Sequence, residues 1–193
     1  GKAGCMGDIG THALHLAAYI SGLRWTEMCA DVNTHVEARR LDDDGAALLH
    51  FEGGASGVLI ASQVCAGEEN PLKIRIYGEK GGIEWRQMDP NTLIVKWTDR
   101  PAELVNTGNG YMGGFAKANT RTPGGHPEGY IEAFANIYRN FARTVLAVRN
   151  GEEPKAEWLD FPGVEDGVRG MQFIETVITS GYDQETKWLK WVE

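Results

Sequence analysis

The sequence predicts an α+β fold, in which a predominantly antiparallel, open β-sheet carries helices packed on one face. Three observations predict it: an amphipathic helix pattern near the start, a long central stretch of short strand-like runs separated by turn residues, and two further helix patterns. The connections between the strand-like runs are too short to hold crossover helices. The strands are therefore expected to pair mainly antiparallel.

The first helix is predicted over residues 8–22. Asp8 can cap its start with its own side chain, and Gly22 supplies the left-handed stop. Helical spacing places Asp8, His12, His15 and Tyr19 on a single polar stripe. An apolar stripe lies about a quarter-turn away and consists of Ile9, Ala13, Leu16, Ala17 and Ile20. A carboxylate directed at an imidazole beside a hydrophobic wall is suited to acid–base chemistry.

The central stretch predicts a series of strands. They cover residues 27–36, 46–52, 56–65, 72–77, 83–87, 92–97 and 103–105, with Gly, Asn, Asp and Pro residues between them. In residues 57–61 the apolar side chains occupy both alternating faces, which predicts a central strand covered on each side. Residues 108–125 are expected to form a long loop containing one helical turn, and such a loop is expected to line a site or an interface because long loops are otherwise uncommon.

Two helices are predicted in the last third, over residues 127–150 and 162–180. The expected core face of the first consists of Ile131, Phe134, Tyr138, Phe141, Val145 and Val148. That of the second consists of Val164, Val168, Met171, Ile174, Val177 and Ile178. Residues 186–192 are predicted as a closing edge strand.

The second face of the sheet is predicted to be a subunit interface, because all three helices are needed on the first. Tyr77, Trp85 and Ile94 are its candidate residues. A homodimer or homotetramer through this open sheet face is therefore expected.

Composition narrows the function classes. The 193 residues, 42% of them hydrophobic, can form one domain spanning 1–193. The net charge of −8 disfavours a nucleic-acid partner, and no apolar run approaches the roughly 18 residues that a membrane helix needs. Residues 1–7 do not resemble a signal peptide. The three cysteines are isolated and odd in number, which disfavours a disulfide framework or thiolate zinc site and favours a reducing cytoplasm.

Four groups of residues, taken in order, carry a family resemblance. They are GCMGDIGTH at 4–12, DDGAALL at 43–49 with FEGGASGV at 51–58, HPEGYIEAFANIY at 126–138, and VEDGV at 164–168 with FIETV at 173–177. As a set they resemble the C-terminal half of the Gfo/Idh/MocA oxidoreductases, the family of glucose-fructose oxidoreductase and inositol dehydrogenase. The resemblance covers essentially the whole chain.

This resemblance implies a two-domain NAD(P)-dependent dehydrogenase acting on a hydroxyl of a sugar, cyclitol or related polyol. Its N-terminal Rossmann domain, which would hold NAD or NADP, is absent from this chain, so no cofactor-binding residue is expected here and the fragment alone is expected to be inactive. The family's Asp-x-x-x-His pair falls on Asp8 and His12. The histidine is implied as general base or acid, and the aspartate as the group that orients it and the substrate. An imidazole, with an ordinary pKa of about 6.5, suits that proton transfer.

Other residues are candidates for substrate contact. The family commonly carries an acidic residue where this chain has His15, which is either a substrate contact or a partly exposed polar residue. His126 resembles the family's substrate-facing loop residue, and Tyr111 lies in the preceding loop. Gly108–Gly113 fits Gly-x-Gly-x-x-Gly literally, but it lacks a βαβ setting and is interpreted as a decoy.

Two alternatives remain at this point. The chain is also consistent with a non-catalytic ligand-binding or assembly domain of the same fold. A metal-dependent sugar isomerase or hydrolase would use Asp8, His12 and His15 as ligands. Those residues span two helical turns, which is longer than the His-x-x-x-His spacing usual for metal ligands on a helix, so no metal is expected.

Overall fold

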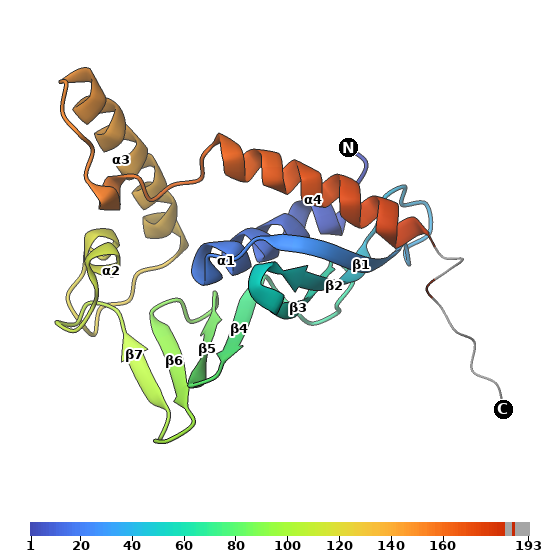
Figure 1. Cartoon of the computed structure of the whole chain (residues 1–193), viewed down its shortest axis with the longest axis horizontal. Helices are drawn as coiled ribbons and strands as arrows, with labels where there is room; N and C mark the ends of the chain where they lie inside the picture. Colours follow the sequence, from blue (N-terminus) through green and yellow to red (C-terminus); the bar gives the residue numbers. More distant parts are fainter. Residues whose placement is uncertain (184–186, 188–193) are drawn as a thin grey trace. The chain divides into compact units, whose positions relative to one another are not determined.

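The computed structural model describes residues 1–183 and residue 187. The chain divides into two compact units, Gly1–Glu69 with the described part of Val164–Glu193, and Asn70–Gly163. Every strand pair in both units is antiparallel, and helices accompany the sheets, which confirms the predicted α+β class (Figure 1). Among the described helices, none combines the length and the apolar character needed to cross a bilayer.

The first unit is built on a three-stranded sheet. Its strands β1 (Trp25–Asn33), β2 (Asp44–Phe51) and β3 (Ser56–Ser62) lie in the order β1-β2-β3. Its helical elements are the π-helix η1 (Met6–Gly10), the α-helices α1 (Thr11–Ser21) and α4 (Val164–Tyr182), and the short 3-10 turn η2 (Glu52–Gly54). The helices η1, α1 and α4 bury side chains against one face of the sheet.

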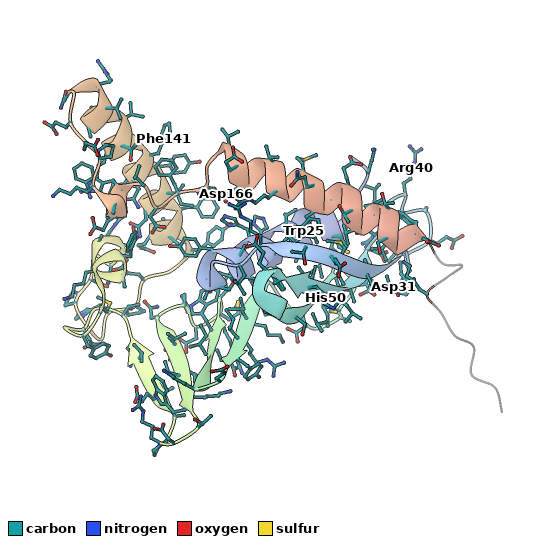
Figure 2. The ribbon with its side chains drawn as sticks, in the orientation of Figure 1. Trp25, Asp31, Arg40, His50, Phe141 and Asp166 are labelled. Atoms are coloured by element: carbon teal, nitrogen blue, oxygen red, sulfur yellow. The ribbon has the colours of Figure 1, made fainter. Side chains whose placement is uncertain are left out.

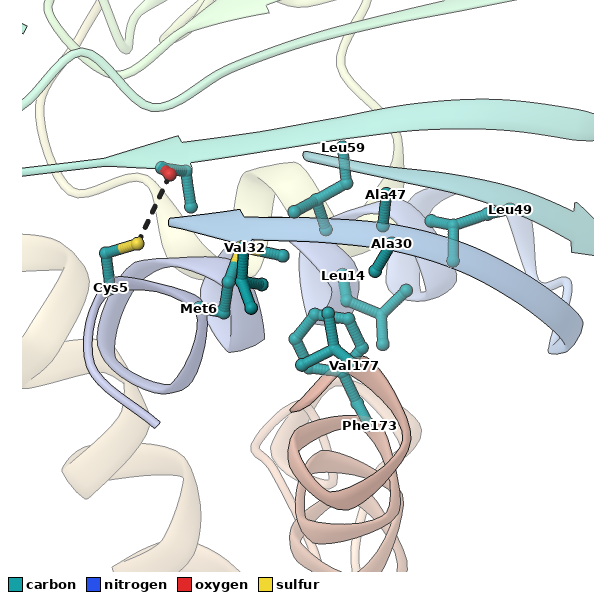
Figure 3. Packing of buried hydrophobic residues seen from close by; sticks show 11 residues of the cluster. Cys5, Met6, Leu14, Ala30, Val32, Ala47, Leu49, Leu59, Phe173 and Val177 are labelled. Atoms are coloured by element: carbon teal, nitrogen blue, oxygen red, sulfur yellow. Dashed lines mark hydrogen bonds between the residues drawn. The ribbon is translucent and has the colours of Figure 1, made fainter. Parts of the chain in front are cut away.

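The core of this unit follows from strand alternation, since every second side chain of a strand points to the same face. The buried strand residues are Ala30, Val32, Ala47, Leu49, Leu59 and Ala61, and the buried helix-side residues are Cys5, Met6, Leu14, Phe173 and Val177. Figure 3 shows Phe173 and Val177 of α4 packed beneath the sheet, near Leu14. Phe173 also lies against Gly10, where an added Cβ would be 3.3 Å from its ring.

The prediction that β3 is a central strand is wrong. β3 lies at the edge of its sheet, and Val58 and Ile60 are 66% and 69% exposed. The apolar residues on its second face are not covered by any other described part of this unit. The pattern correctly identified a strand with two apolar faces but could not say what covers the second one.

The start of the first helix also differs from the prediction. Helical structure begins before Asp8, which sits inside η1 and donates its own backbone N–H to the Gly4 carbonyl at 2.9 Å. Asp8 is therefore not the cap residue. The physical reason is a carboxylate distant in sequence, Asp42, which accepts the N–H groups of Gly4 and Met6 and so satisfies the helix start one turn earlier.

The second unit has a four-stranded sheet in the order β4-β5-β6-β7. Its strands are β4 (Lys73–Gly78), β5 (Gly81–Arg86), β6 (Thr92–Trp97) and β7 (Glu103–Asn106); its helices are α2 (Gly114–Asn119), α3 (Tyr130–Arg149) and the 3-10 turn η3 (Ala156–Trp158). A single open sheet was expected, but β3 and β4 do not pair. The segment between β3 and β4 contains Gly67, whose backbone has a positive φ, and Pro71, which has no backbone N–H to donate. Both features interrupt regular strand structure.

The proposed interface residues of this sheet do not share one face. Tyr77 and Ile94 lie on the same face. Directly paired residues share a face, and Tyr77 pairs with Gly82, which in turn pairs with Lys96. Ile94 is two residues from Lys96 on the same strand and therefore points to the same side. Trp85 is three residues from Gly82 on the same strand, an odd spacing, and therefore points to the opposite face. There its indole N–H donates to the Pro90 carbonyl at 3.1 Å. Only Tyr77 of the three is strongly exposed.

The later helices form where the pattern predicts them, but their apolar faces are only partly buried. In α3 the expected core residues are all exposed by between 39% and 79%, and the buried residues are Asn140 and Ala147. In α4, Phe173 and Val177 are fully buried while Val164, Val168 and Met171 are exposed. The predicted closing strand over 186–192 lies outside the described residues except for Lys187.

Candidate active site

The helix that carries Asp8 and His12 is anchored by a buried carboxylate. Asp42, 1% exposed, accepts hydrogen bonds from the backbone N–H groups of Gly4 at 2.6 Å and Met6 at 2.8 Å. Its backbone carbonyl accepts the Cys5 N–H at 2.9 Å. Gly4 must be glycine, because a Cβ would overlap the Asp42 carbonyl oxygen. Long-range pairing thus fixes the turn just before Asp8.

The Cys5 thiol belongs to the same anchor. It lies 3.2 Å from an Asp42 carboxylate oxygen and 3.3 Å from the Ala61 carbonyl oxygen, and Figure 3 draws the second contact. Burial raises the pKa of Cys5 far above its ordinary value, and the hydrogen bond to Asp42 raises it further. The thiol therefore stays protonated and its single S–H hydrogen is shared between these two oxygens, which gives it a structural role.

Asp43 holds the neighbouring loop. Its fully buried carboxylate accepts the backbone N–H groups of His35 at 2.8 Å and Val36 at 3.0 Å, and the Arg39 guanidinium at 3.2 Å. The hydrogen bond from His35 lowers the pKa of Asp43; burial opposes this, and Val36 and Arg39 add to the lowering. Ionised Asp43 therefore stabilises the folded chain.

Replacing Asp43 by Asn is expected to lower the free energy of unfolding at neutral pH, because an amide offers one acceptor oxygen in place of two. A carboxyl group whose folded pKa is lowered stabilises above its unfolded pKa of 3.8 and loses that contribution as the pH falls through its folded pKa. The difference between wild type and variant should therefore shrink below about pH 4 in urea unfolding. The exposed Asp99→Asn change is the control, and a pH-independent difference would contradict this role.

The candidate catalytic residues lie on the exposed side of this helix. Asp8 is in η1, His12 and His15 are in α1, and all three side chains are exposed. A π-helical turn directly before an α-helix often marks a functional site. The structure thus places Asp8 in the π-helical turn and the two histidines in the α-helix that continues it, so the three residues follow one another at spacings of four and three along one continuous helical segment.

Two polar side chains from other elements flank this row, and sequence reasoning missed both. The side-chain amide of Gln63, just after β3, donates to the Asp8 carboxylate at 3.3 Å. The Asp166 carboxylate, in the first turn of α4, lies 3.8 Å from His15 Nε2; Figure 2 labels Asp166 at that end of the helix. The only local signal for Asp166 was its place in the VEDGV segment.

His126 and Tyr111 belong to the second unit. The loop before α3 is organised by Glu128, which accepts the N–H groups of Arg121 at 2.5 Å and Thr122 at 2.7 Å. Burial opposes ionisation of Glu128, but these hydrogen bonds outweigh it and lower its pKa. His126 is exposed, with Nδ1 3.3 Å from the Pro123 carbonyl oxygen, and Tyr111 is 62% exposed.

Residues 2–84 match the family model for the GFO/IDH/MocA C-terminal domain. This chain belongs to that family. A 31% identical relative, the uncharacterized oxidoreductase YfiI of Bacillus subtilis (strain 168), aligns over 192 residues, which are 98% of this chain and 49% of the relative. The chain thus spans about half the length of the curated relative it matches.

Solved structures agree with this assignment. An oxidoreductase from Sinorhizobium meliloti is 40% identical with a TM-score of 0.88, covering 93% of this chain and 50% of its own. An inositol dehydrogenase homolog from Azotobacter vinelandii, solved with NADH and myo-inositol, is 31% identical with a TM-score of 0.83 and covers 92% of this chain and 47% of its own. Both structures agree with the family match over most of this chain, and the second is a complex with NADH and myo-inositol.

The Gly-rich segment of this C-terminal domain does not fit a dinucleotide. Gly108–Gly113 follows β7, which pairs antiparallel with β6, and leads into α2, a helix of six residues. A Rossmann site requires a parallel βαβ unit and a long helix whose N-terminus receives the pyrophosphate. Across residues 1–183 and 187, no group of three His, Cys, Asp or Glu side chains is placed to hold a metal ion.

Proposed function

We propose that the complete protein carrying this chain is an NAD(P)-dependent dehydrogenase that oxidises a hydroxyl of a sugar, cyclitol or related polyol. In this proposal, residues 1–193 act as a single substrate-binding and oligomerisation domain. The observation that carries it is the exposed Asp8–His12 pair on an anchored helix, in a chain of an oxidoreductase family. The chain alone is expected to be inactive.

His12 is proposed as the general base that takes the proton from the substrate hydroxyl. Asp8 would orient the imidazole and stabilise its protonated form, since a nearby carboxylate favours the imidazolium. When bound, the oxidised nicotinamide accepts the hydride that the alcohol carbon loses. Because the Gly-rich segment does not fit a dinucleotide, we place NAD or NADP outside this chain, in the part of the protein that corresponds to the other half of its relatives.

The relative solved with myo-inositol supports this proposed substrate class. His15, His126 and Tyr111 are proposed as hydroxyl contacts, since imidazole and phenol groups can both donate to and accept from a hydroxyl. Asp166 would hold the His15 ring from α4, supplying an acidic group next to the position where the family commonly carries one. The three free cysteines, two of them exposed, support a proposed location in a reducing cytoplasm.

The test is an assay of the complete protein with NAD⁺ or NADP⁺ and a panel of cyclitols, aldoses and alditols. Formation of reduced nicotinamide with at least one polyol is the expected result. If no polyol is oxidised while the protein still binds a nicotinamide cofactor, the dehydrogenase proposal is wrong for this substrate class.

We also propose that the uncovered face of the β1-β2-β3 sheet forms a subunit interface of a homodimer or homotetramer. Leu48 and Val58 are direct cross-strand partners on this face, and with Ile60 they are 60% to 69% exposed. A contiguous apolar patch of this kind is unusual on a monomer. Ile60→Glu should therefore lower the molar mass measured by light scattering, while Val36→Glu, a matched change in a loop, should not. An unchanged mass for Ile60→Glu would place the interface elsewhere.

A further inference from the structure

A side chain outside the candidate helix contacts its carboxylate directly. Nε2 of Gln63 donates to Oδ2 of Asp8 at 3.3 Å, across a separation of 55 residues in the sequence. Both side chains are exposed, so the contact does not depend on burial within the core. It lies at the surface where the proposed substrate would meet Asp8.

The two partners of this hydrogen bond are held by the same pair of buried residues. Asp42 fixes the turn before Asp8 through the N–H groups of Gly4 and Met6. The backbone carbonyl of Asp43 accepts the N–H of Gln63 at 2.8 Å, directly after the last β3 residue pairs with Asp44. The Asp42–Asp43 dipeptide therefore sets the distance between the Gln63 and Asp8 backbones, independently of the side-chain contact.

We propose that Gln63 is a positioning residue for Asp8, an inference that rests on the proposed function. Its neutral amide occupies one oxygen of the Asp8 carboxylate and leaves the other to accept from His12 or from a substrate hydroxyl. The amide is neutral and keeps its donor hydrogens, so it can hold the carboxylate in one orientation. Catalytic groups held this way lose little orientational freedom at the moment of reaction.

The hydrogen bond is tested in the complete protein with two uncharged variants of Gln63. Gln63→Met removes the donor without adding a charge, and it is expected to lower kcat about tenfold while KM changes less than about twofold. Gln63→Asn keeps a neutral amide donor and should retain more of kcat than Gln63→Met. Gln172→Met, an equivalent change at an exposed position on α4, is the control and should match wild type.

Because Gln63 is exposed, the midpoint of thermal unfolding should be the same in all four proteins. A Gln63→Met enzyme with wild-type kcat would overturn the proposal, as would a loss of kcat that parallels a loss of thermal stability. Equal losses in Gln63→Met and Gln63→Asn would also overturn it, since donor capacity would then not matter.

The failure of this inference is distinguishable from failure of the dehydrogenase proposal. If His12→Ala abolishes polyol-dependent reduction of NAD(P)⁺ but Gln63→Met does not lower kcat, only the positioning role is wrong. If His12→Ala is as active as wild type, the proposed proton transfer itself fails.

Discussion

Replacing His12 by Ala in the complete protein is expected to lower kcat for polyol oxidation by about 10²–10⁴-fold, the usual contribution of a positioned general base. Without the imidazole, the hydroxyl proton must leave to water in the transition state. KM should change much less, because the loss affects the chemical step rather than ground-state binding. Steady-state kinetics followed by the absorbance of reduced nicotinamide measure both quantities.

The control for this substitution is His35→Ala. His35 is also exposed, and its contribution to the Asp43 site is made by its backbone N–H, which Ala retains. Its kcat should equal that of wild type. If His12→Ala keeps kcat within tenfold of wild type, the chain is better described as a non-catalytic ligand-binding or assembly domain.

Replacing Phe173 by Ala is expected to lower the free energy of unfolding by about 3–5 kcal/mol, as for other fully buried Phe residues. Phe173 is 0% exposed and lies at the centre of the core between α4 and the sheet. Its ring rests against Gly10, where η1 with Asp8 meets α1 with His12. The substitution should therefore leave a cavity beneath the junction that joins the two candidate catalytic residues.

Urea unfolding of the chain measures this effect, with Phe115→Ala as the matched control. Phe115 lies on α2 and is 51% exposed, so its truncation should cost less than about 1 kcal/mol. A similarly small cost for Phe173→Ala would mean that the core does not depend on this ring.

Local patterns located most of the elements in this chain. The strands of the second unit, the end of α3 near Gly151 and the extent of α4 were predicted within a few residues, because turn residues and helical periodicity act locally. Burial was predicted less well. The α3 residues expected in the core are exposed. A hydrophobic stripe indicates that one face of a helix is suited to burial, but it does not identify the element that packs against that face.

The acidic run at 42–44 shows the same limit. In the sequence it follows Arg39 and Arg40 and has the composition of a solvated charged loop. In the structure Asp42 and Asp43 are buried and accept hydrogen bonds from two separate backbone segments. Carboxylates are rarely buried unless such donors surround them, and no local pattern reveals donors that come from elsewhere in the chain.

Residue order alone predicted the α+β class, the family resemblance and the placement of Asp8, His12 and His15 along one helix. These features depend on residue order and on spacings of three and four, which are local. The folded chain reveals three further contacts: Asp42 accepts the N–H groups at the start of this helix, Gln63 donates to Asp8, and Asp166 lies beside His15. Asp42 lies 36 residues from Met6 in the sequence, and Gln63 lies 55 residues from Asp8. Asp166 lies on α4, far along the chain from His15. Only folding brings these atoms within hydrogen-bonding or ion-pairing distance.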